Sequence, residues 1–305
     1  MSAPFLRPYP DLTEHAHGLS LRSPAKINLS LRVLGKRPDG YHALDTIFQE
    51  LDWADMLDIA EADDFGLEVV GADLPVDNSN LITRAARLLA EEARRPCQAR
   101  IRLDKVLPLR GGVGGGSSNA ALTLLGLNRL WGLDWPISRL DELAGRLGAD
   151  CPFFLYGGLA RGTGRGDKIT SLDGAIAGVI LVVLPPFGVN TAWAFSQFRF
   201  PLTEVEKNVI FNPLLPTGME GLHTPISACN DLENIVFRAH SELGAVRNCL
   251  LRGGASVSLL SGSGSSLFGI FESEQAAHVA ARELPDIGNG WRYQVCQPVA
   301  RPRQR

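Results

Sequence analysis

The sequence has few cysteines, and none of the patterns that would give them a structural role. Its five cysteines (Cys97, Cys151, Cys229, Cys249 and Cys296) are scattered over 305 residues and form no Cys-x-x-Cys pair. An odd and dispersed set of thiols excludes a disulfide framework and a zinc ribbon. We therefore expect a cytoplasmic protein that lives in a reducing compartment and holds no structural metal.

The chain also lacks a charge excess and a long hydrophobic run. Its net charge is −3 and its pI is near 6.1, which gives no basic footprint for nucleic acid or an acidic membrane. The longest apolar run, residues 175–184, is too short to cross a bilayer and is typical of a buried strand. Residues 1–12 lack the apolar segment of a secretory signal. We expect a soluble monomer or weak homodimer with no nucleic-acid or membrane partner.

Several common catalytic motifs are missing. No Gly-Lys-Ser/Thr triplet closes a Walker A loop, and the Gly-x-Gly-x-x-Gly spacing of dinucleotide-binding proteins fails in the glycine-rich stretch. Neither His-Glu-x-x-His nor Gly-x-Ser-x-Gly occurs, so metalloprotease and serine-hydrolase functions have no support. The His15-x-His17 pair is more easily explained as coincidence than as a metal site.

What the chain does have is a glycine-rich loop at residues 108–119. Five of six successive positions are glycine (Gly111, Gly112, Gly114, Gly115 and Gly116), and an apolar-periodic helix is predicted to begin near Ala120. Exposed backbone N–H groups and the positive end of a helix dipole together favour anion binding, most often of phosphate. The alternative is a flexible linker, but a linker rarely leads directly into an amphipathic helix.

Length and patterning predict an α+β protein of two domains, residues 1–172 and 173–305. Residues 1–18 are predicted to be a loose leader. In the first domain we predict strands at 24–33, 44–51 and 99–104, a helix at 81–94 capped by Asn80, and a helix opened by a Ser138-x-x-Asp141 capping box and ended at Gly148. In the second we predict strands at 179–184, 256–260, 267–271 and 291–297, with helices at 242–250 and 274–283. That order suggests a split βαβ arrangement.

Three further segments could carry chemistry. Strand alternation predicts that Lys26 and Asn28 lie side by side on the face opposite the core, where a solvated lysine is the plainer interpretation. Asp150 follows a helix end, and it could cap local backbone or act as a general base. Residues 261–266, rich in serine and glycine, could be a simple hairpin loop or a second anion-facing loop.

Taken in order, these segments resemble the GHMP kinase superfamily. The resemblance rests on residues 24–29, the Gly40-Tyr41-His42 turn, and residues 111–120, 148–154 and 261–266, and it covers the chain from about residue 19 to 271. It implies an N-terminal domain like ribosomal protein S5 domain 2 and a ferredoxin-like C-terminal domain. The motifs at residues 25–29, 39–42 and 149–154 narrow the resemblance to one member of the superfamily. That member implies ATP- and Mg²⁺-dependent phosphorylation of the 2-hydroxyl of 4-diphosphocytidyl-2-C-methyl-D-erythritol, a step of the non-mevalonate route to isoprenoids.

The resemblance further implies roles for individual residues. Asp150 matches the catalytic base and Lys26 its catalytic partner. The ATP loop corresponds to Pro108, Leu109, Arg110, Gly111, Gly112, Val113, Gly114, Gly115, Gly116, Ser117 and Ser118. The substrate side corresponds to Asn28, Tyr41 and His42, with a weaker match at Thr191 and Phe195.

One departure from the family pattern and two alternatives accompany this prediction. Arg110 stands where the family usually has glycine or alanine, which could alter contacts with the nucleotide. A different GHMP kinase, such as homoserine or mevalonate kinase, would share the loop but should lack the Tyr-His pair after the turn. A non-catalytic ligand sensor could have lost Lys26 or Asp150, and both are present.

Overall fold

The computed structural model describes residues 12–109, 111–199, 228–284 and 290–302. They form two compact units, each built from segments distant in sequence. Unit 1 contains the described residues of 1–25, 53–107 and 114–155, and unit 2 those of 26–52, 108–113 and 156–305. Strands β2 (Gly18–Lys36) and β3 (His42–Ala60) contribute to both units. The predicted domain boundary at residue 172 divides the chain differently and stays a prediction.

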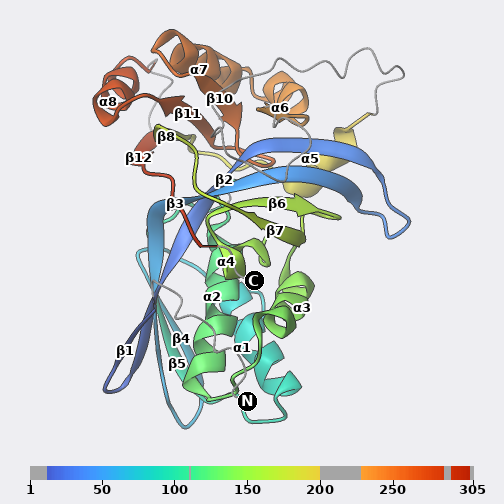
Figure 1. Cartoon of the computed structure of the whole chain (residues 1–305), viewed down its shortest axis with the longest axis vertical. Helices are drawn as coiled ribbons and strands as arrows, with labels where there is room; N and C mark the ends of the chain where they lie inside the picture. The colour runs from blue at the N-terminus through green and yellow to red at the C-terminus, as the bar shows by residue number, and fades with distance from the viewer. Residues whose placement is uncertain (1–11, 110, 200–227, 285–289, 303–305) are drawn as a thin grey trace. The chain divides into compact units, whose positions relative to one another are not determined.

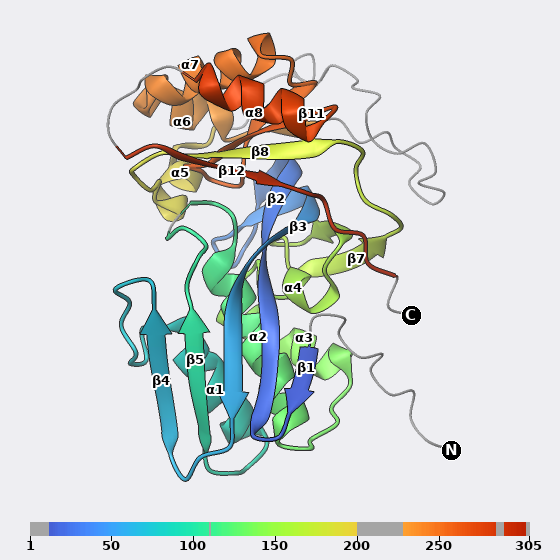
Figure 2. The same ribbon diagram turned by 90° about the vertical axis from the view of Figure 1, so that its left-hand side faces the viewer.

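Unit 1 is a sheet covered on one face by three helices (Figure 2). The strand order is β1 (Leu12–His15), β2, β3, β5 (Ala99–Asp104) and β4 (Phe65–Val70). β4 pairs with β5 in parallel, whereas β1–β2 and β3–β5 are antiparallel. The covering helices are α1 (Leu81–Glu92), α2 (Gly115–Leu130) and α3 (Ile137–Leu147).

The helix ends of unit 1 test the local predictions. The side chain of Asn80 accepts a hydrogen bond from the backbone of Ile82, so the predicted cap of α1 is confirmed. The capping box at Ser138 is wrong, because α3 begins after Pro136 and has no side-chain cap. α3 ends before Gly148, as predicted. The leader prediction is wrong for residues 12–15, which form β1, and residues 1–11 lie outside the described residues.

Unit 2 contains a four-stranded antiparallel sheet in the order β10, β11, β8, β12. These strands are β8 (Val179–Leu184), β10 (Val257–Leu260), β11 (Leu267–Phe271) and β12 (Arg292–Cys296). Helices α6 (Glu233–Ala239), α7 (Ser241–Arg252) and α8 (Glu274–Arg282) lie on one face of this sheet (Figure 1). The chain therefore runs strand, helices, two strands, helix, strand, which is the split βαβ order expected from the sequence.

The rest of unit 2 is built on the ends of β2 and β3. β6 (Leu159–Thr163) pairs with β3 and with β7 (Lys168–Leu172), and β9 (Cys229–Asn230) pairs with β2 in parallel. The described residues also form two short helices, α4 (Phe153–Tyr156) and α5 (Thr191–Gln197).

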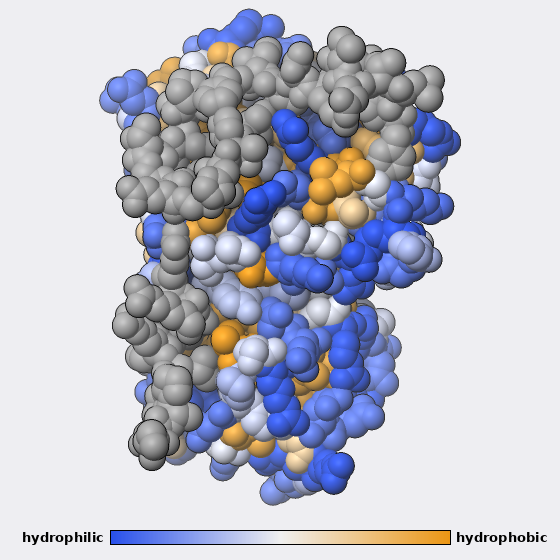
Figure 3. Space-filling model, turned by 45° about the vertical axis from the view of Figure 1, so that its right-hand side comes forward, coloured by the Kyte–Doolittle hydropathy of each residue, from blue (hydrophilic) through white to orange (hydrophobic). Residues whose placement is uncertain are grey.

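Apolar side chains fill the interior. Every residue of β8 is buried, as the apolar run at 175–184 predicted for a strand. On the face drawn in Figure 3, hydrophilic side chains dominate the coloured surface and hydrophobic ones form small separate patches. Within the described ranges, no helix combines the length and the apolar character needed to cross a bilayer.

Candidate active site

Strand β2 carries Lys26 and Asn28 on one face, two residues apart, and both side chains are buried. The ammonium of Lys26 donates a hydrogen bond to Oδ1 of Asn28 at 2.6 Å. The amide of Asn28 then donates to Oγ1 of Thr46 at 2.7 Å, and that hydroxyl donates to the carbonyl of Ser30 at 2.6 Å. Each step of this chain fixes the orientation of the next group, so the lysine is held in place by bonds that run through Asn28 into β3.

The prediction that these residues face away from the core is wrong. Lys26 and Asn28 are each only 2% exposed, because both faces of β2 are covered in this stretch. The ammonium also lies 5.4 Å from the ring centre of Phe48. A buried lysine needs polar partners, since an unpaired buried charge is costly. Its position therefore favours a functional role over the plain alternative of a solvated charge.

The serine-glycine loop, residues 261–266, lies against the first part of the glycine-rich loop. The backbone N–H of Ser266 donates to the carbonyl of Gly111 at 3.1 Å, and Oγ of Ser261 donates to the carbonyl of Gly112 at 3.0 Å. The same loop reaches Lys26, because a Cβ placed on Gly262 would lie 3.5 Å from the lysine Nζ. Unit 2 thus brings together three segments that the sequence singled out separately.

Asn230, in β9, is a residue that the sequence analysis missed. Its side-chain amide donates to the carbonyls of Leu260 at 2.8 Å and Gly262 at 2.7 Å, so it holds the entrance of the serine-glycine loop. Its Oδ1 accepts from the backbone of Leu232 at 2.9 Å. A single asparagine in an otherwise ordinary segment has no spacing pattern that could have identified it.

The second part of the glycine-rich loop starts helix α2 in unit 1. Gly114 takes a left-handed conformation (φ +77°) and the helix begins at Gly115, five residues before the predicted start at Ala120. No side chain caps this end, so the first-turn N–H groups are not occupied by a side-chain acceptor. That is the geometry that anion-binding helix ends require.

A buried polar cluster supports this helix end, and the sequence analysis missed it too. The carboxylate of Asp55 accepts hydrogen bonds from the ammonium of Lys105 at 2.7 Å, from the backbone of Val106 and Leu107 at 2.7 Å each, and from Asn119 at 2.9 Å. Burial lowers the pKa of Lys105, although Asp55 opposes the shift. The cluster therefore connects the strand entering the loop to the first turn of α2.

Asp150 lies in the turn between α3 and α4, in unit 1, and is half-buried. Its neighbour Cys151 is fully buried, and burial raises the pKa of that thiol to about 12. The side chain of Ser117, in the first turn of α2, opposes this shift. The chain at Asp150 therefore lies close to the helix end that the glycine-rich loop forms.

The expected substrate residues lie in unit 2. The ring of His42 stacks on Phe195 with centroids 5.3 Å apart and meets Phe198 edge-on at 6.4 Å. The hydroxyl of Thr191 bonds to that of Ser263 at 2.7 Å, which ties the start of α5 to the serine-glycine loop. Tyr41 follows the tight turn and is 56% exposed.

The predicted site residues are divided between the units. Lys26, Asn28, the expected substrate residues and Pro108–Val113 belong to unit 2, whereas Gly114–Ser118 and Asp150 belong to unit 1. Arg110 lies outside the described residues.

Comparison with known proteins gives relatives that match most of this chain and most of their own length. Family models for the N-terminal and C-terminal domains of GHMP kinases match residues 80–158 and 219–290. A 4-diphosphocytidyl-2-C-methyl-D-erythritol kinase of Solibacter usitatus is 40% identical over 96% of this chain and 92% of its own length. A kinase of the same name from Chlorobium chlorochromatii is 40% identical over 86% of this chain and 91% of its own.

Solved structures agree with this assignment. A 4-(cytidine 5'-diphospho)-2C-methyl-D-erythritol kinase is 35% identical, with a TM-score of 0.72 over 91% of this chain and 98% of the other. A homoserine kinase from Cytophaga hutchinsonii shares the fold at 16% identity and a TM-score of 0.68, over 94% of this chain and 96% of its own. The predicted two-domain α+β fold is confirmed, and the chain belongs to the GHMP kinase family.

Proposed function

We propose that the protein is an ATP-dependent kinase that phosphorylates the 2-hydroxyl of 4-diphosphocytidyl-2-C-methyl-D-erythritol in isoprenoid precursor synthesis. The observation that carries the proposal is the 40% identity, over nearly full length, to kinases named for that substrate. All five cysteines are free thiols, which fits a cytoplasmic location. The acceptor is a small molecule, and the proposal involves neither nucleic acid nor a membrane. The boundary near residue 172 remains our proposed domain limit.

The glycine-rich loop, residues 108–118, is proposed to hold the phosphates of ATP. The uncapped start of α2 fits such a ligand, and the structure offers room for it at Gly116. A Cβ on that exposed glycine would meet, of the residues that the structure describes, only Leu81, at an ordinary 3.6 Å. Backbone N–H groups can therefore be approached closely from outside. Mg²⁺ is proposed to be held largely by the phosphate oxygens, and it would neutralise charge on them.

Asp150 and Lys26 are proposed to carry the chemistry. As the 2-hydroxyl oxygen forms its bond to the γ-phosphorus and the bond to ADP breaks, the Asp150 carboxylate accepts the hydroxyl proton. Lys26 stabilises negative charge on the transferring group and orients the hydroxyl. Its hydrogen bond to Asn28 supports this role, because a lysine with a fixed direction costs little reorganisation during the reaction.

The cytidyl end of the substrate is proposed to be bound by Tyr41, His42 and Phe195, while Thr191 and Asn28 are proposed as further substrate-side residues. The stacking of His42 on Phe195 supports an aromatic recognition site in unit 2. Aromatic faces are suited to a nucleobase because each base offers a flat π surface. Thr191 is hydrogen-bonded to Ser263 of the serine-glycine loop, so a substrate that contacts Thr191 would also reach that loop.

The leading alternative is a kinase of the same fold with another alcohol as acceptor. Homoserine and mevalonate kinases share the fold with this chain at 13–18% identity, which leaves the acceptor open on structural grounds alone. Purified protein should be tested in a coupled ADP-release assay with ATP, Mg²⁺ and each candidate alcohol. We expect turnover with the cytidyl substrate and none with homoserine, mevalonate or galactose. Comparable turnover of mevalonate or homoserine, or none of the cytidyl substrate, would refute the proposal.

A further inference from the structure

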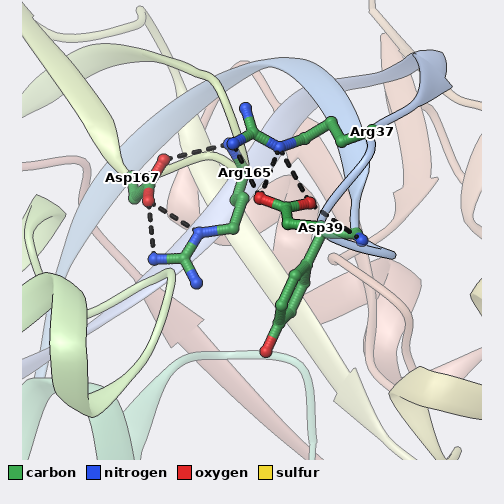
Figure 4. A network of polar contacts seen from close by, with 5 residues as sticks. Arg37, Asp39, Arg165 and Asp167 are labelled. Carbon is green, nitrogen blue, oxygen red and sulfur yellow. Dashed lines mark hydrogen bonds and ion pairs between the residues drawn. The ribbon is translucent and has the colours of Figure 1, made fainter.

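Two turns of unit 2 bring four charged residues together at the tip of the β2–β3 hairpin (Figure 4). One turn joins β2 to β3 and carries Arg37 and Asp39. The other joins β6 to β7 and carries Arg165 and Asp167. The guanidinium of Arg37 bonds to Asp39 from Nε at 3.0 Å and from Nη2 at 2.8 Å. That of Arg165 bonds to Asp167 from Nε at 2.8 Å and from Nη2 at 2.7 Å.

The two pairs also act on each other. The hydrogen bond from Arg37 lowers the pKa of Asp39, and the charge of Arg165 contributes to the same shift. The pKa of Arg37 is in turn raised, mainly by its hydrogen bond to Asp39 and also by the charge of Asp167. Each charge thus has neighbours of opposite sign on both turns. Two nitrogens of each guanidinium converge on one carboxylate oxygen, Oδ2 of Asp39 or of Asp167, so each ion pair restrains the direction of its guanidinium.

Tyr41 is the residue that this arrangement constrains. Its backbone N–H donates to Oδ1 of Asp39 at 3.1 Å, and its carbonyl accepts from the backbone of Arg37 at 2.8 Å. Its ring lies under the guanidinium of Arg165, 5.0 Å from carbon to ring centre. More than half of the tyrosine nevertheless stays exposed. An exposed ring on a turn would sample several rotamers unless a neighbour favoured one of them.

We infer that Arg165, held by Asp167, is a positioning residue that fixes the ring of Tyr41 for stacking against the base of the nucleotide substrate. This inference rests on the proposed function. A role in stability alone explains the network less well, since the Arg37–Asp39 pair is exposed and exposed ion pairs add little to stability. A cation over one face of the ring restrains it and leaves the remaining surface for a ligand. Arg165 would then act on substrate affinity through Tyr41 without contacting the reacting atoms.

The test compares Arg165→Met, which removes the cation and keeps an apolar stem, with Arg165→Lys, which keeps a cation. Arg161→Met is the matched control, because that arginine lies on the adjoining strand β6 and forks onto Asp45 instead. A cation–π contact at an exposed site corresponds to about a two- to fivefold change in affinity. We expect Arg165→Met to raise KM for the cytidyl substrate by about that factor, with kcat and KM for ATP unchanged. Arg165→Lys should recover part of the loss, and Arg161→Met should behave as wild type.

A double-variant cycle separates positioning from direct contact. Tyr41→Ala alone should raise KM for the cytidyl substrate about ten- to a hundredfold, and adding Arg165→Met to it should cause no further rise. An additive effect, or an unchanged KM for Arg165→Met in a protein whose melting temperature is intact, overturns the inference while the proposed function stands. If Arg165→Met unfolds, the same comparison is made with Arg165→Lys. Effects of Arg165→Lys and Tyr41→Ala on KM for the cytidyl substrate that simply add would then count against the inference. Absence of cytidyl-substrate turnover by the wild type overturns both.

Discussion

Replacing Gly116 with alanine should weaken ATP binding without weakening the fold. Gly116 lies in the first turn of α2 and is exposed, and among the described residues a Cβ added there would meet only Leu81, at 3.6 Å. Helical Cβ atoms tilt toward the N-terminus of their helix. The added methyl group would therefore lie where an anion approaches the backbone N–H groups, and its closest contact within the described part of the chain is an ordinary van der Waals one.

The size of both effects can be estimated. A hydrogen bond to a charged group is worth about 1.5–3 kcal/mol, so losing one such phosphate contact should raise the Kd for ATP by about 10- to 100-fold. Alanine in a helix is more favourable than glycine by about 0.5–1 kcal/mol. We therefore expect Gly116→Ala to bind ATP more weakly and to melt at the same or a higher temperature than wild type.

Two other glycines make the experiment decisive. Gly145, in α3, has no atom of a described residue within 4 Å of an added Cβ, so Gly145→Ala should gain the same helix stability and keep wild-type ATP binding. Gly112 has φ +76°, and its Cβ would lie 2.3 Å from the carbonyl oxygen of Ser261, so Gly112→Ala should lose stability and ATP binding together. Nucleotide titration and thermal melts on all three variants give the comparison. Wild-type ATP affinity in a stable Gly116→Ala protein would refute the phosphate role of the loop.

Three further predictions address catalysis, pH and thiol chemistry. Asp150→Asn should lower kcat in the ADP-release assay by about 10²–10⁴-fold. The control is Asp134→Asn, which should leave kcat intact, because Asp134 is exposed, lies in the same unit and has a left-handed backbone that asparagine tolerates. Equal kcat values for the two variants would reject Asp150 as the base. Burial raises the pKa of Glu233, so its contribution to stability is present below its ordinary pKa of 4.5 and is lost as pH rises through the raised value. Glu233→Gln keeps an acceptor for the backbone of Leu260 and should therefore gain stability over wild type between pH 4 and 7 in urea unfolding. A stability difference between variant and wild type that stayed constant over that range would contradict this. Iodoacetamide at pH 8 should alkylate the half-buried Cys249 before the fully buried Cys151, whose pKa is about 12, and peptide mapping that found the reverse order would contradict the burial argument.

Local patterns in the sequence predicted the elements and the outline of the site. Periodicity identified most strands of both units, and the turn at residues 37–40 is confirmed by the bond from Gly40 N–H to the carbonyl of Arg37. The glycine-rich loop was recognised because glycine frees the backbone whatever surrounds it. The start of α2 was misjudged, since glycine and serine carry no apolar periodicity and the helix begins among them at Gly115.

Contacts between distant segments could not be predicted from local patterns. The carboxylate of Asp55 finds Lys105 and Asn119 at separations of 50 and 64 residues, and no spacing within one segment encodes such a meeting. Asn230 reaches Gly262 of the serine-glycine loop across 32 residues, and no local spacing encodes that contact either. These polar groups act through tertiary packing, so their roles follow only once the fold is known.

The burial of Lys26 shows how a wrong prediction points to function. From Ala25 to Leu31 both faces of β2 are covered, and at such positions apolar residues usually give a more stable strand. The chain instead places Lys26 and Asn28 there and satisfies them through Thr46. Desolvating these groups costs stability that the hydrogen bonds offset only in part. A polar row kept at that cost in the middle of a buried strand supports the proposed role of Lys26 in the chemistry, and this support does not depend on the family motif in which the lysine lies.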